Sequence, residues 1–225
     1  MLDEFSKRNR AVRAALDIAA ERGWNKVTFT AIAERTGLSL ADLRQDFSCK
    51  TDILKAFQAE VDAEMLGKIK PPTPEQSVRD RLFDVVMTRF ETMQPYKPAL
   101  GRISASLCCH PGEAAMLLCS TLDSQYWMLE GAGAKLQGPG AGLRVAGLAS
   151  IYSKVFRVWL DDSTPGLDYT MAALDRRLRR GEELLAGVES LCRLACGLMP
   201  RGWARREDRK TAEPGGSTSA TPAGA

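Results

Sequence analysis

The stretch from Val27 to Leu54, VTFTAIAERTGLSLADLRQDFSCKTDIL, constrains this chain more than any other part of its sequence. Within it, Ala33, Gly37 and Leu43 are separated by four and six positions. A helix-turn-helix needs this spacing, because a small residue lies where two helices cross, a glycine adopts the left-handed turn conformation, and an apolar residue closes the pair. The sequence therefore predicts a helix-turn-helix, a unit that presents one helix to the DNA major groove.

The rest of the sequence is helical in pattern. Apolar residues recur at steps of three and four, whereas the alternating runs that indicate strands are nearly absent. Thr28 and Ser39 occupy the N-cap positions before the second and third helices. We predict an all-α fold of about nine helices, in which an N-terminal three-helix DNA-binding domain with the helix-turn-helix precedes a C-terminal helical bundle.

Breaks in the pattern indicate the domain organisation. Pro71, Pro72 and Pro74 interrupt the chain after the fourth helix, and QGPGAG at 137–142 predicts a loop after a seventh helix that ends near Leu136. The segment from Glu207 is rich in Ser, Thr, Gly, Pro and Ala, a composition that predicts disorder. We predict a DNA-binding domain at 1–58, a ligand-binding and dimerisation domain at 59–203, and a disordered tail at 204–225.

Charge and cysteine usage limit the possible classes of protein. The net charge of the 225 residues is only +3, so a DNA-binding surface has to be local. Residues 1–58 hold ten Lys/Arg against eight Asp/Glu, with basic residues clustered at 7, 8, 10 and 13. The six cysteines show no paired spacing, the first ten residues lack a signal peptide's apolar core, and no apolar run suits a membrane span. We expect reduced thiols and a cytoplasmic protein.

Three segments resemble the TetR family of bacterial transcription regulators. They are AAERG at 19–23, VTFTAIAERTGLS at 27–39 and DFSCKTDIL at 46–54, and the likeness is specific over residues 10–57. Further on, only the helix count and the last two helices agree with the family. The resemblance implies an all-helical homodimer with an N-terminal DNA-binding domain, a ligand-sensing C-terminal domain and dimerisation through the last two helices. It also implies transcription regulation, most often repression.

The third helix is the expected reading helix. Arg44 can donate two hydrogen bonds to guanine and Gln45 can pair with adenine, and each such contact discriminates by about 1–3 kcal/mol. Thr28, Thr30 and Lys50 lie at helix starts, where backbone amides and the helix dipole favour a phosphate, so these residues would set the register. The expected DNA-binding residues are Thr28, Thr30, Ser39, Leu40, Ala41, Asp42, Arg44, Gln45 and Lys50.

An alternative interpretation of this helix stays open, in which the fold is retained and the reading surface is lost. The TetR family usually carries an aromatic residue where this chain has Arg44. Asp42 and Asp46 would repel phosphates, although Asp42 can accept a hydrogen bond from cytosine. The small excess of basic over acidic residues at 1–58 also gives only a weak electrostatic attraction to DNA. DNA binding is nevertheless the favoured prediction.

Aromatic and methionine side chains are spread over the C-terminal helices that would pack together. Such side chains can line an adaptable apolar cavity, although at helical spacing they are also typical of plain core. As a set they predict a pocket for a small hydrophobic effector, whose identity the sequence does not give. The expected lining residues are Met87, Phe90, Met93, Trp127, Tyr152 and Phe156.

The ninth helix carries the sharpest apolar pattern. Its apolar residues advance by steps of three and four, which predicts a seam for a partner helix, and Gly181 at the centre permits close approach. A two-fold homodimer formed this way suits a palindromic operator in double-stranded DNA. The alternative is that this face packs inside its own subunit. The expected dimerisation residues are Trp159, Met171, Leu174, Leu178, Leu185, Val188 and Cys192.

A second resemblance concerns residues 152–184, which look like the C-terminal part of an accessory family of coenzyme-Q biosynthesis. The matching features are an aromatic helix, an acidic D-S turn, and a helix with Thr170, Leu174, Asp175, Arg177 and Leu178. Members of that family have a TetR-like fold and bind lipid instead of DNA. The alternative function is thus a lipid-binding accessory protein of isoprenoid-quinone (ubiquinone) synthesis, in which the basic run at 176–180 meets a membrane surface.

Signals for catalysis are poor. His110 is the only histidine, and it follows Cys108 and Cys109 directly, so the three cannot easily surround one zinc ion. The sequence has no phosphate-binding glycine loop and no nucleophile elbow. We therefore predict no enzyme, no catalytic residues, no metal site and no cofactor.

Overall fold

The structure, a computed structural model, describes residues 6–71, 73, 75–137 and 140–198, with the backbone alone described from residue 184 onward. No strand occurs in these residues, so the prediction of an all-α fold of about nine helices is confirmed for them. The elements are α1 (Lys7–Arg22), η1 (Trp24–Lys26), α2 (Phe29–Thr36), α3 (Leu40–Asp46), α4 (Lys50–Lys68), α5 (Val78–Met93), η2 (Gln94–Tyr96), α6 (Lys97–Cys109), α7 (Pro111–Gly131), α8 (Ala141–Asp161) and α9 (Asp168–Leu198).

Helices α2 and α3 form the predicted helix-turn-helix. The hydroxyl of Thr28 accepts a hydrogen bond of 3.1 Å from the backbone N–H of Ala31, and that of Ser39 accepts one of 3.0 Å from Asp42. Both predicted N-caps are therefore confirmed. Gly37 ends α2 with a φ of +70°, a left-handed conformation in which a Cβ atom would be strained.

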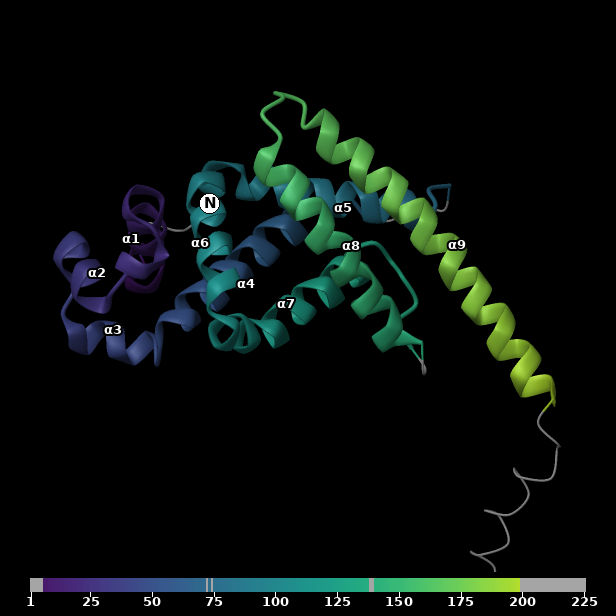
Figure 1. Cartoon of the computed structure of the whole chain (residues 1–225), viewed down its shortest axis with the longest axis horizontal. Helices are drawn as coiled ribbons and strands as arrows, with labels where there is room; N and C mark the ends of the chain where they lie inside the picture. Colours follow the sequence, from purple (N-terminus) through teal and green to yellow (C-terminus); the bar gives the residue numbers. More distant parts are fainter. Residues whose placement is uncertain (1–5, 72, 74, 138–139, 199–225) are drawn as a thin grey trace, which may run out of the picture. The chain divides into compact units, whose positions relative to one another are not determined.

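The three N-terminal helices share one apolar core. Figure 1 shows α1, α2 and α3 grouped at one end of α4. Leu16 of α1, Ile32 of α2 and Leu43 of α3 are each at most 2 % exposed. Because each helix is too short to be stable alone, this shared burial holds the helix-turn-helix in place.

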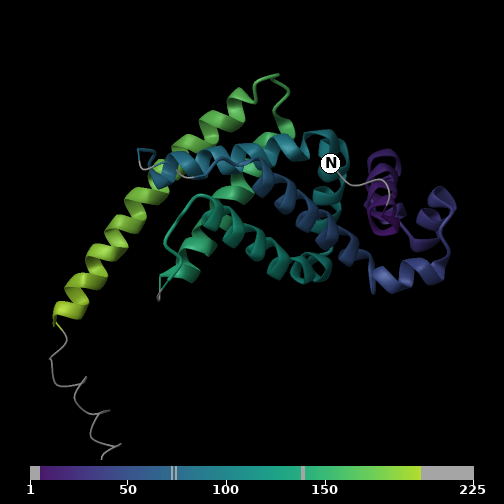
Figure 2. The same cartoon turned by 180° about the vertical axis from the view of Figure 1, so that it is seen from behind.

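Helix α4 connects the helix-turn-helix to the following helices. Three residues separate it from α3, and it packs against α7 and α5, while α1 packs against α6. Figure 2 shows α4 and α7 side by side from the opposite direction. Position 58, where we predicted a domain boundary, lies inside α4. The division at that residue stays a prediction.

The seventh helix ends at Gly131, five residues before the predicted end. Gly133 takes a φ of +70°, and its N–H bonds to the carbonyl of Glu130 at 2.8 Å while Ala134 bonds to Leu129 at 2.9 Å. These two bonds are the Schellman motif, which closes the free carbonyls at a helix end. The segment GAGA at 131–134 was expected to continue the helix, whereas its second glycine, Gly133, ends it.

Packing divides the chain into one unit that ends at Glu182 and a second that begins at Glu183, within α9. In the first unit, Leu174 and Leu178 of α9 are buried. In the second unit the described residues continue α9 to Leu198. The predicted tail at 204–225 lies outside the described residues. No helix in the described part of the chain is long and apolar enough to cross a membrane.

Candidate nucleic-acid interface

Helix α3 has one buried face and one exposed face. Leu43 and the capping residue Phe47 are each 2 % exposed and pack into the three-helix core. The opposite face carries Arg44 and Gln45, both exposed, and Leu40, which is 54 % exposed. Ala41 is also exposed. The structure thus brings the expected reading residues together on a surface that no described part of the chain covers.

Asp42 lies on the same short helix, but its charge is locally compensated. One carboxylate oxygen accepts a 2.7 Å hydrogen bond from the ammonium of Lys7 on α1, and the other accepts bonds from the backbone N–H and hydroxyl of Ser39. The hydrogen bond from Lys7, followed by those from Ser39, lowers the pKa of Asp42 to about 2. Asp42 therefore acts as a helix cap and an anchor to α1, and its repulsion of a phosphate is reduced.

Lys7 is the first of the basic residues clustered at 7, 8, 10 and 13. In the structure it lies in the first turn of α1, paired with Asp42, while Arg8 and Arg10 are exposed on the same helix. Arg8 and Arg10 of α1 and Arg44 of α3 are therefore exposed cations of the N-terminal helices. Arg44 itself makes a long contact of 3.4 Å with the hydroxyl of Ser48, which leaves most of its donors available.

Two of the expected phosphate-binding residues lie in suitable places. Thr28 and Thr30 are exposed at the start of α2, the helix that precedes the reading helix. Lys50 differs from them, because its ammonium lies 4.7 Å from the centre of the Trp24 ring and 3.7 Å from a carboxylate oxygen of Glu113. This geometry does not support Lys50 as a phosphate contact, since its charge is engaged between α4 and α7.

Glu113 connects the first turn of α7 to the N-terminal helices. Its second carboxylate oxygen accepts a 3.0 Å hydrogen bond from the indole of Trp24, which is 1 % exposed. Nearby, the hydroxyl of Ser106 on α6 donates a 2.8 Å hydrogen bond to Asn25. These contacts attach η1, directly before the helix-turn-helix, to the corner between α6 and α7.

Most of the residues expected to line a pocket do come together. Phe90 of α5 stacks on Tyr152 of α8 with ring centres 5.1 Å apart, and on Trp159 at 5.4 Å. Phe156 contacts Tyr152 at 6.1 Å and Trp159 at 5.5 Å. We call Phe90, Tyr152, Phe156 and Trp159 the aromatic cluster. The hydroxyl of Tyr152 also lies 3.9 Å from the sulfur of Met93, and Met87 is buried on the same helix as Phe90.

Trp127 does not join this cluster. It is 50 % exposed on α7, where it contacts only Tyr126 among the described aromatic rings, with centres 6.0 Å apart. The buried face of α7 packs against α4 and presents other residues, so Trp127 points away from α4. Met116 and Leu118 on the same helix are also at least half exposed.

A buried polar group lies beside the aromatic cluster, and sequence reasoning missed it. Arg89 of α5, 3 % exposed, forms an ion pair with Asp62 of α4 and donates a 3.1 Å hydrogen bond to the hydroxyl of Tyr152. Ser124 of α7 donates a 2.6 Å hydrogen bond to Asp62, and the neighbouring Gln125 is 1 % exposed. We call these five residues the polar core cluster.

Burial and Arg89 act on the pKa of the Tyr152 hydroxyl in opposite directions. Burial raises the pKa of its hydroxyl, and the charge and hydrogen bond of Arg89 oppose that rise. One signal in the sequence could have indicated this cluster. Arg89 continues the apolar stripe of Leu82, Val85 and Val86 at helical spacing, and a charged residue in such a stripe needs a buried partner.

Three of the expected dimerisation residues pack inside their own chain. Trp159 and Leu174 are fully buried, and Leu178 is 5 % exposed. Gly181, expected to admit a partner helix, instead faces Ile151 of α8, whose terminal carbon lies 3.0 Å from the position of a Cβ atom. The open alternative that this face packs within its subunit therefore holds for these positions. Met171 is partly exposed, and the side chains of Leu185, Val188 and Cys192 lie outside the described residues.

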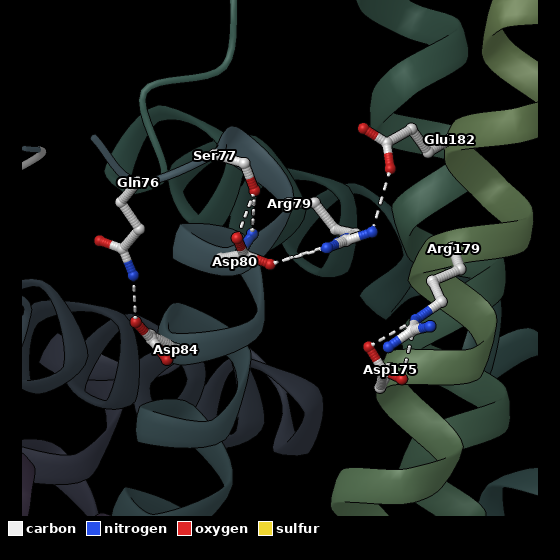
Figure 3. A network of polar contacts seen from close by, with 8 residues as sticks. All are labelled: Gln76, Ser77, Arg79, Asp80, Asp84, Asp175, Arg179 and Glu182. Carbon is white, nitrogen blue, oxygen red and sulfur yellow. Dashed lines mark hydrogen bonds and ion pairs between the residues drawn. The ribbon is translucent and has the colours of Figure 1, made fainter. Parts of the chain in front are cut away.

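One polar contact joins α5 to α9, and others lie within each of the two helices, as Figure 3 shows. Arg79 contacts Asp80 at 3.1 Å and Glu182 at 3.5 Å, and Arg179 contacts Asp175 at 3.0 Å. An open groove of about 370 Å³ lies between the two helices. It is lined by Arg79, Asp80, Phe83 and Asp84 of α5 and by Met171, Ala172, Asp175 and Leu178 of α9.

The acidic turn of the second resemblance has a structural role. Although burial alone would raise it, the pKa of Asp162 is lowered by hydrogen bonds from Thr164 and Thr170. Thr170 donates to Asp162 both from its backbone N–H, at 2.9 Å, and from its hydroxyl, at 2.8 Å. The turn therefore fixes the start of α9, a role that is compatible with either resemblance.

The described residues contain no group of three His, Cys, Asp or Glu side chains placed to hold a metal ion. His110 is exposed at the end of α6, with its Nδ1 atom 2.8 Å from the carbonyl oxygen of Ser106.

Comparison with solved structures identifies the architecture. The chain superposes on a TetR transcriptional regulator from Nitrosomonas europaea with a TM-score of 0.64 and 20% identity, covering 79% of this chain and 98% of that one. A TetR transcriptional regulator from Rhodococcus sp. RHA1 gives 0.54 at 18% identity, over 76% and 93% of the two chains. A TetR-family regulator from Streptomyces coelicolor gives 0.53 at 19% identity, over 90% and 95%.

These likenesses establish the fold of the chain, which is TetR-like as the N-terminal segments predicted. They extend over almost the whole length of each related structure. Neither the family models nor the curated proteins include one that matches the sequence.

Proposed function

We propose that the protein is a DNA-binding transcription regulator that acts as a homodimer on a palindromic operator and is controlled by a small hydrophobic effector. The proposal is based on the TetR-like fold, and the exposed face of the expected reading helix α3 supports it. Repression is the mode we favour, because a regulator that binds across a promoter blocks transcription without a further partner.

One observation carries the proposal. Helix α3 is fixed by its buried face, by the capping residue Ser39 and by the Lys7–Asp42 contact, yet its other face is exposed. That face combines a guanidinium and a side-chain amide, Arg44 and Gln45, the two groups that read guanine and adenine edges. A helix that is held in place on one side and presents these two groups on the other is suited to reading bases.

A route from an effector to the reading helix is also available. Helix α4 starts at Lys50, directly after α3, and carries Asp62 in the polar core cluster. A change at Asp62 would therefore move the helix that positions the reading helix. In a dimer, such a change alters the separation of the two reading helices and selects between DNA-binding and non-binding states.

The test is binding of the full chain to the DNA upstream of its own gene, measured by fluorescence anisotropy over a salt series. We expect specific binding that weakens steeply with salt, because counterions are released from the phosphates. Arg44→Ala should weaken specific binding by about 1–3 kcal/mol, or roughly 5- to 150-fold. It should also relax the base preference at one operator position.

Arg157→Ala is the matched control, since Arg157 is an exposed arginine on α8, far along the chain from the helix-turn-helix. Its specific affinity should stay at the wild-type value. Equal affinities of wild type and Arg44→Ala for the specific site would refute α3 as the reading helix.

The lipid-binding accessory protein is the second candidate, and one observation favours it. Helix α7 exposes an unusual amount of apolar surface for a helix in a folded chain, with Met116, Leu118 and Trp127 at least half exposed. The second candidate predicts no sequence-specific DNA binding and recovery of an apolar lipid with the purified protein. Native mass spectrometry of the same preparation therefore separates the two candidates.

A further inference from the structure

Gln125 is a buried amide with no hydrogen-bond partner among the described residues. It is 1 % exposed, and both its Oε1 and its Nε2 atom are unpaired. Buried polar groups in native proteins are nearly always hydrogen-bonded, since an unpaired group loses its contacts with water and gains nothing. An unpaired amide in the core therefore marks a place where a bound molecule can supply the missing hydrogen bonds.

The surroundings of Gln125 indicate what that partner is. The adjacent Ser124 bonds to Asp62, and Arg89 lies within 3.4 Å of the Ser124 hydroxyl. Arg89 and the unpaired Nε2 atom of Gln125 supply hydrogen-bond donors, whereas the Ser124 hydroxyl donates to Asp62, the one carboxylate of the polar core cluster. A guanidinium binds a carboxylate strongly because it can donate two parallel hydrogen bonds, and an amide N–H can add another.

The aromatic cluster supplies the other half of such a site. Arg89 bonds to the hydroxyl of Tyr152, whose ring stacks on Phe90, so the polar and aromatic groups are continuous. Tyr152 and Phe156 are only partly buried, and they lie one turn apart on α8. These two side chains therefore connect the aromatic cluster to the surface of the described residues.

We propose that Arg89 and Gln125 form the polar end of the effector site and that the effector is a small aromatic carboxylic acid. Its carboxylate accepts hydrogen bonds from the guanidinium of Arg89 and from Nε2 of Gln125, and its ring packs on Phe90 and Tyr152. The identification of this ligand as an effector rests on the proposed function, whereas the binding site itself does not.

The position of Asp62 gives the site a regulatory consequence. A bound carboxylate competes with Asp62 for Arg89, and the two carboxylates repel each other. Asp62 is on α4, so binding weakens the attachment of α4 to α5. Helix α4 is then free to shift together with the helix-turn-helix that precedes it.

Isothermal titration calorimetry of the full chain tests the site without DNA. The probes are benzoate, trans-cinnamate and 1-naphthoate, each compared with its carboxamide. We expect at least one carboxylate to bind, and to bind at least tenfold more tightly than its amide. Gln125→Leu should weaken that binding at least tenfold without lowering the thermal midpoint of unfolding, because it removes only unpaired polar atoms.

Gln58→Leu is the matched control. Gln58 of α4 is a partly buried amide that accepts a 2.7 Å hydrogen bond from Ser120 and donates one of 3.3 Å to Thr121. Its replacement should lower the thermal midpoint and leave the carboxylate affinity at the wild-type value. Affinity falls only for Gln125→Leu and the thermal midpoint falls only for Gln58→Leu, which distinguishes loss of a ligand contact from loss of a structural contact.

The proposal is overturned if none of the three carboxylates binds, if acid and amide bind equally, or if Gln125→Leu binds like wild type. DNA binding is measured separately, so the two proposals fail in different ways. Carboxylate binding in a protein that ignores operator DNA would support this site and refute the regulator. A DNA-binding protein that ignores the carboxylates would do the reverse.

Discussion

Trp24 and Glu113 are 89 positions apart in sequence, yet the indole nitrogen of Trp24 donates a 3.0 Å hydrogen bond to a carboxylate oxygen of Glu113. The other oxygen of Glu113 lies 3.7 Å from the ammonium of Lys50, the first residue of α4. A single side chain at the start of α7 therefore holds both sides of the helix-turn-helix. Movement of α7 relative to α4 cannot occur without straining or breaking these contacts.

Glu113→Ala should destabilise the protein. The indole of Trp24 is 1 % exposed and would be left without an acceptor, which costs about 1–3 kcal/mol. Glu113→Gln keeps an acceptor for the indole and should lose less than half as much. Urea unfolding at 25 °C measures the difference, with Glu34→Ala on the exposed side of α2 as control. Equal stability of Glu113→Ala and wild type would show that the contact contributes nothing.

Gly37→Ala should also destabilise the protein, for a conformational reason. The φ of Gly37 is +70°, and no atom lies within 4 Å of a Cβ placed there, so the cost comes from the backbone alone. We expect about 1–2 kcal/mol for alanine and less for Gly37→Asn, since asparagine tolerates this conformation.

Gly67→Ala is the control for the substitution at Gly37. Gly67 lies inside α4 and also has open space around its Cβ position, but its backbone is helical. Alanine there should stabilise the protein by about 0.5–1 kcal/mol, because it is the better helix former. The same sign of change at both glycines would contradict the left-handed turn.

Local chemistry made the N-terminal part predictable from the sequence. The N-caps Thr28 and Ser39 and the turn at Gly37 act through neighbours within four residues, and the structure has all three as predicted. The exposure of Arg44 and Gln45 followed from the helical period once the buried position of Leu43 was assigned.

The C-terminal part was less predictable because periodicity shows which residues share a face and not what covers that face. The stripe through Leu174 and Leu178 was read as a seam for a second copy, whereas it packs within the chain. Trp127 was placed in the pocket on composition alone and lies on the surface. The pairing of Asp62 with Arg89 depends on where α4 and α5 meet, which no local pattern encodes.

Acid should weaken the anchoring of the reading helix. The folded-state pKa of Asp42 is about 2, below its ordinary value of 3.8, chiefly because of the hydrogen bond from Lys7. Asp52 in the cap of α4 also has a pKa of about 2, chiefly because of Lys55. A carboxyl group whose pKa is lower in the folded than in the unfolded protein stabilises the fold when it is ionised. The stabilisation by Asp42 and Asp52 is therefore present above pH 4 and is lost as the pH falls from 4 to 2.

Lys7→Ala tests this assignment. It should reduce the loss of unfolding free energy between pH 4 and pH 2, because Asp42 then has a pKa closer to its unfolded value. Arg8→Ala, an exposed neighbour on α1, should leave the pH profile unchanged. The profiles come from urea unfolding at half-unit steps of pH. Identical profiles for Lys7→Ala and wild type would exclude the Lys7–Asp42 contact as a source of stability.

The ion pair between Asp62 and Arg89 should show strong coupling in a double-mutant cycle. Arg89→Met leaves the carboxylate of Asp62, which is 9 % exposed, without a counter-charge, and we expect a loss of about 3–5 kcal/mol. The double variant Asp62→Leu/Arg89→Met removes both charges, so it should be clearly more stable than Arg89→Met alone. If the stability losses of the two single variants add up to the loss of the double variant, the two charges do not interact. Coupling, by contrast, would identify the junction of α4 and α5 as a point where a competing carboxylate can act.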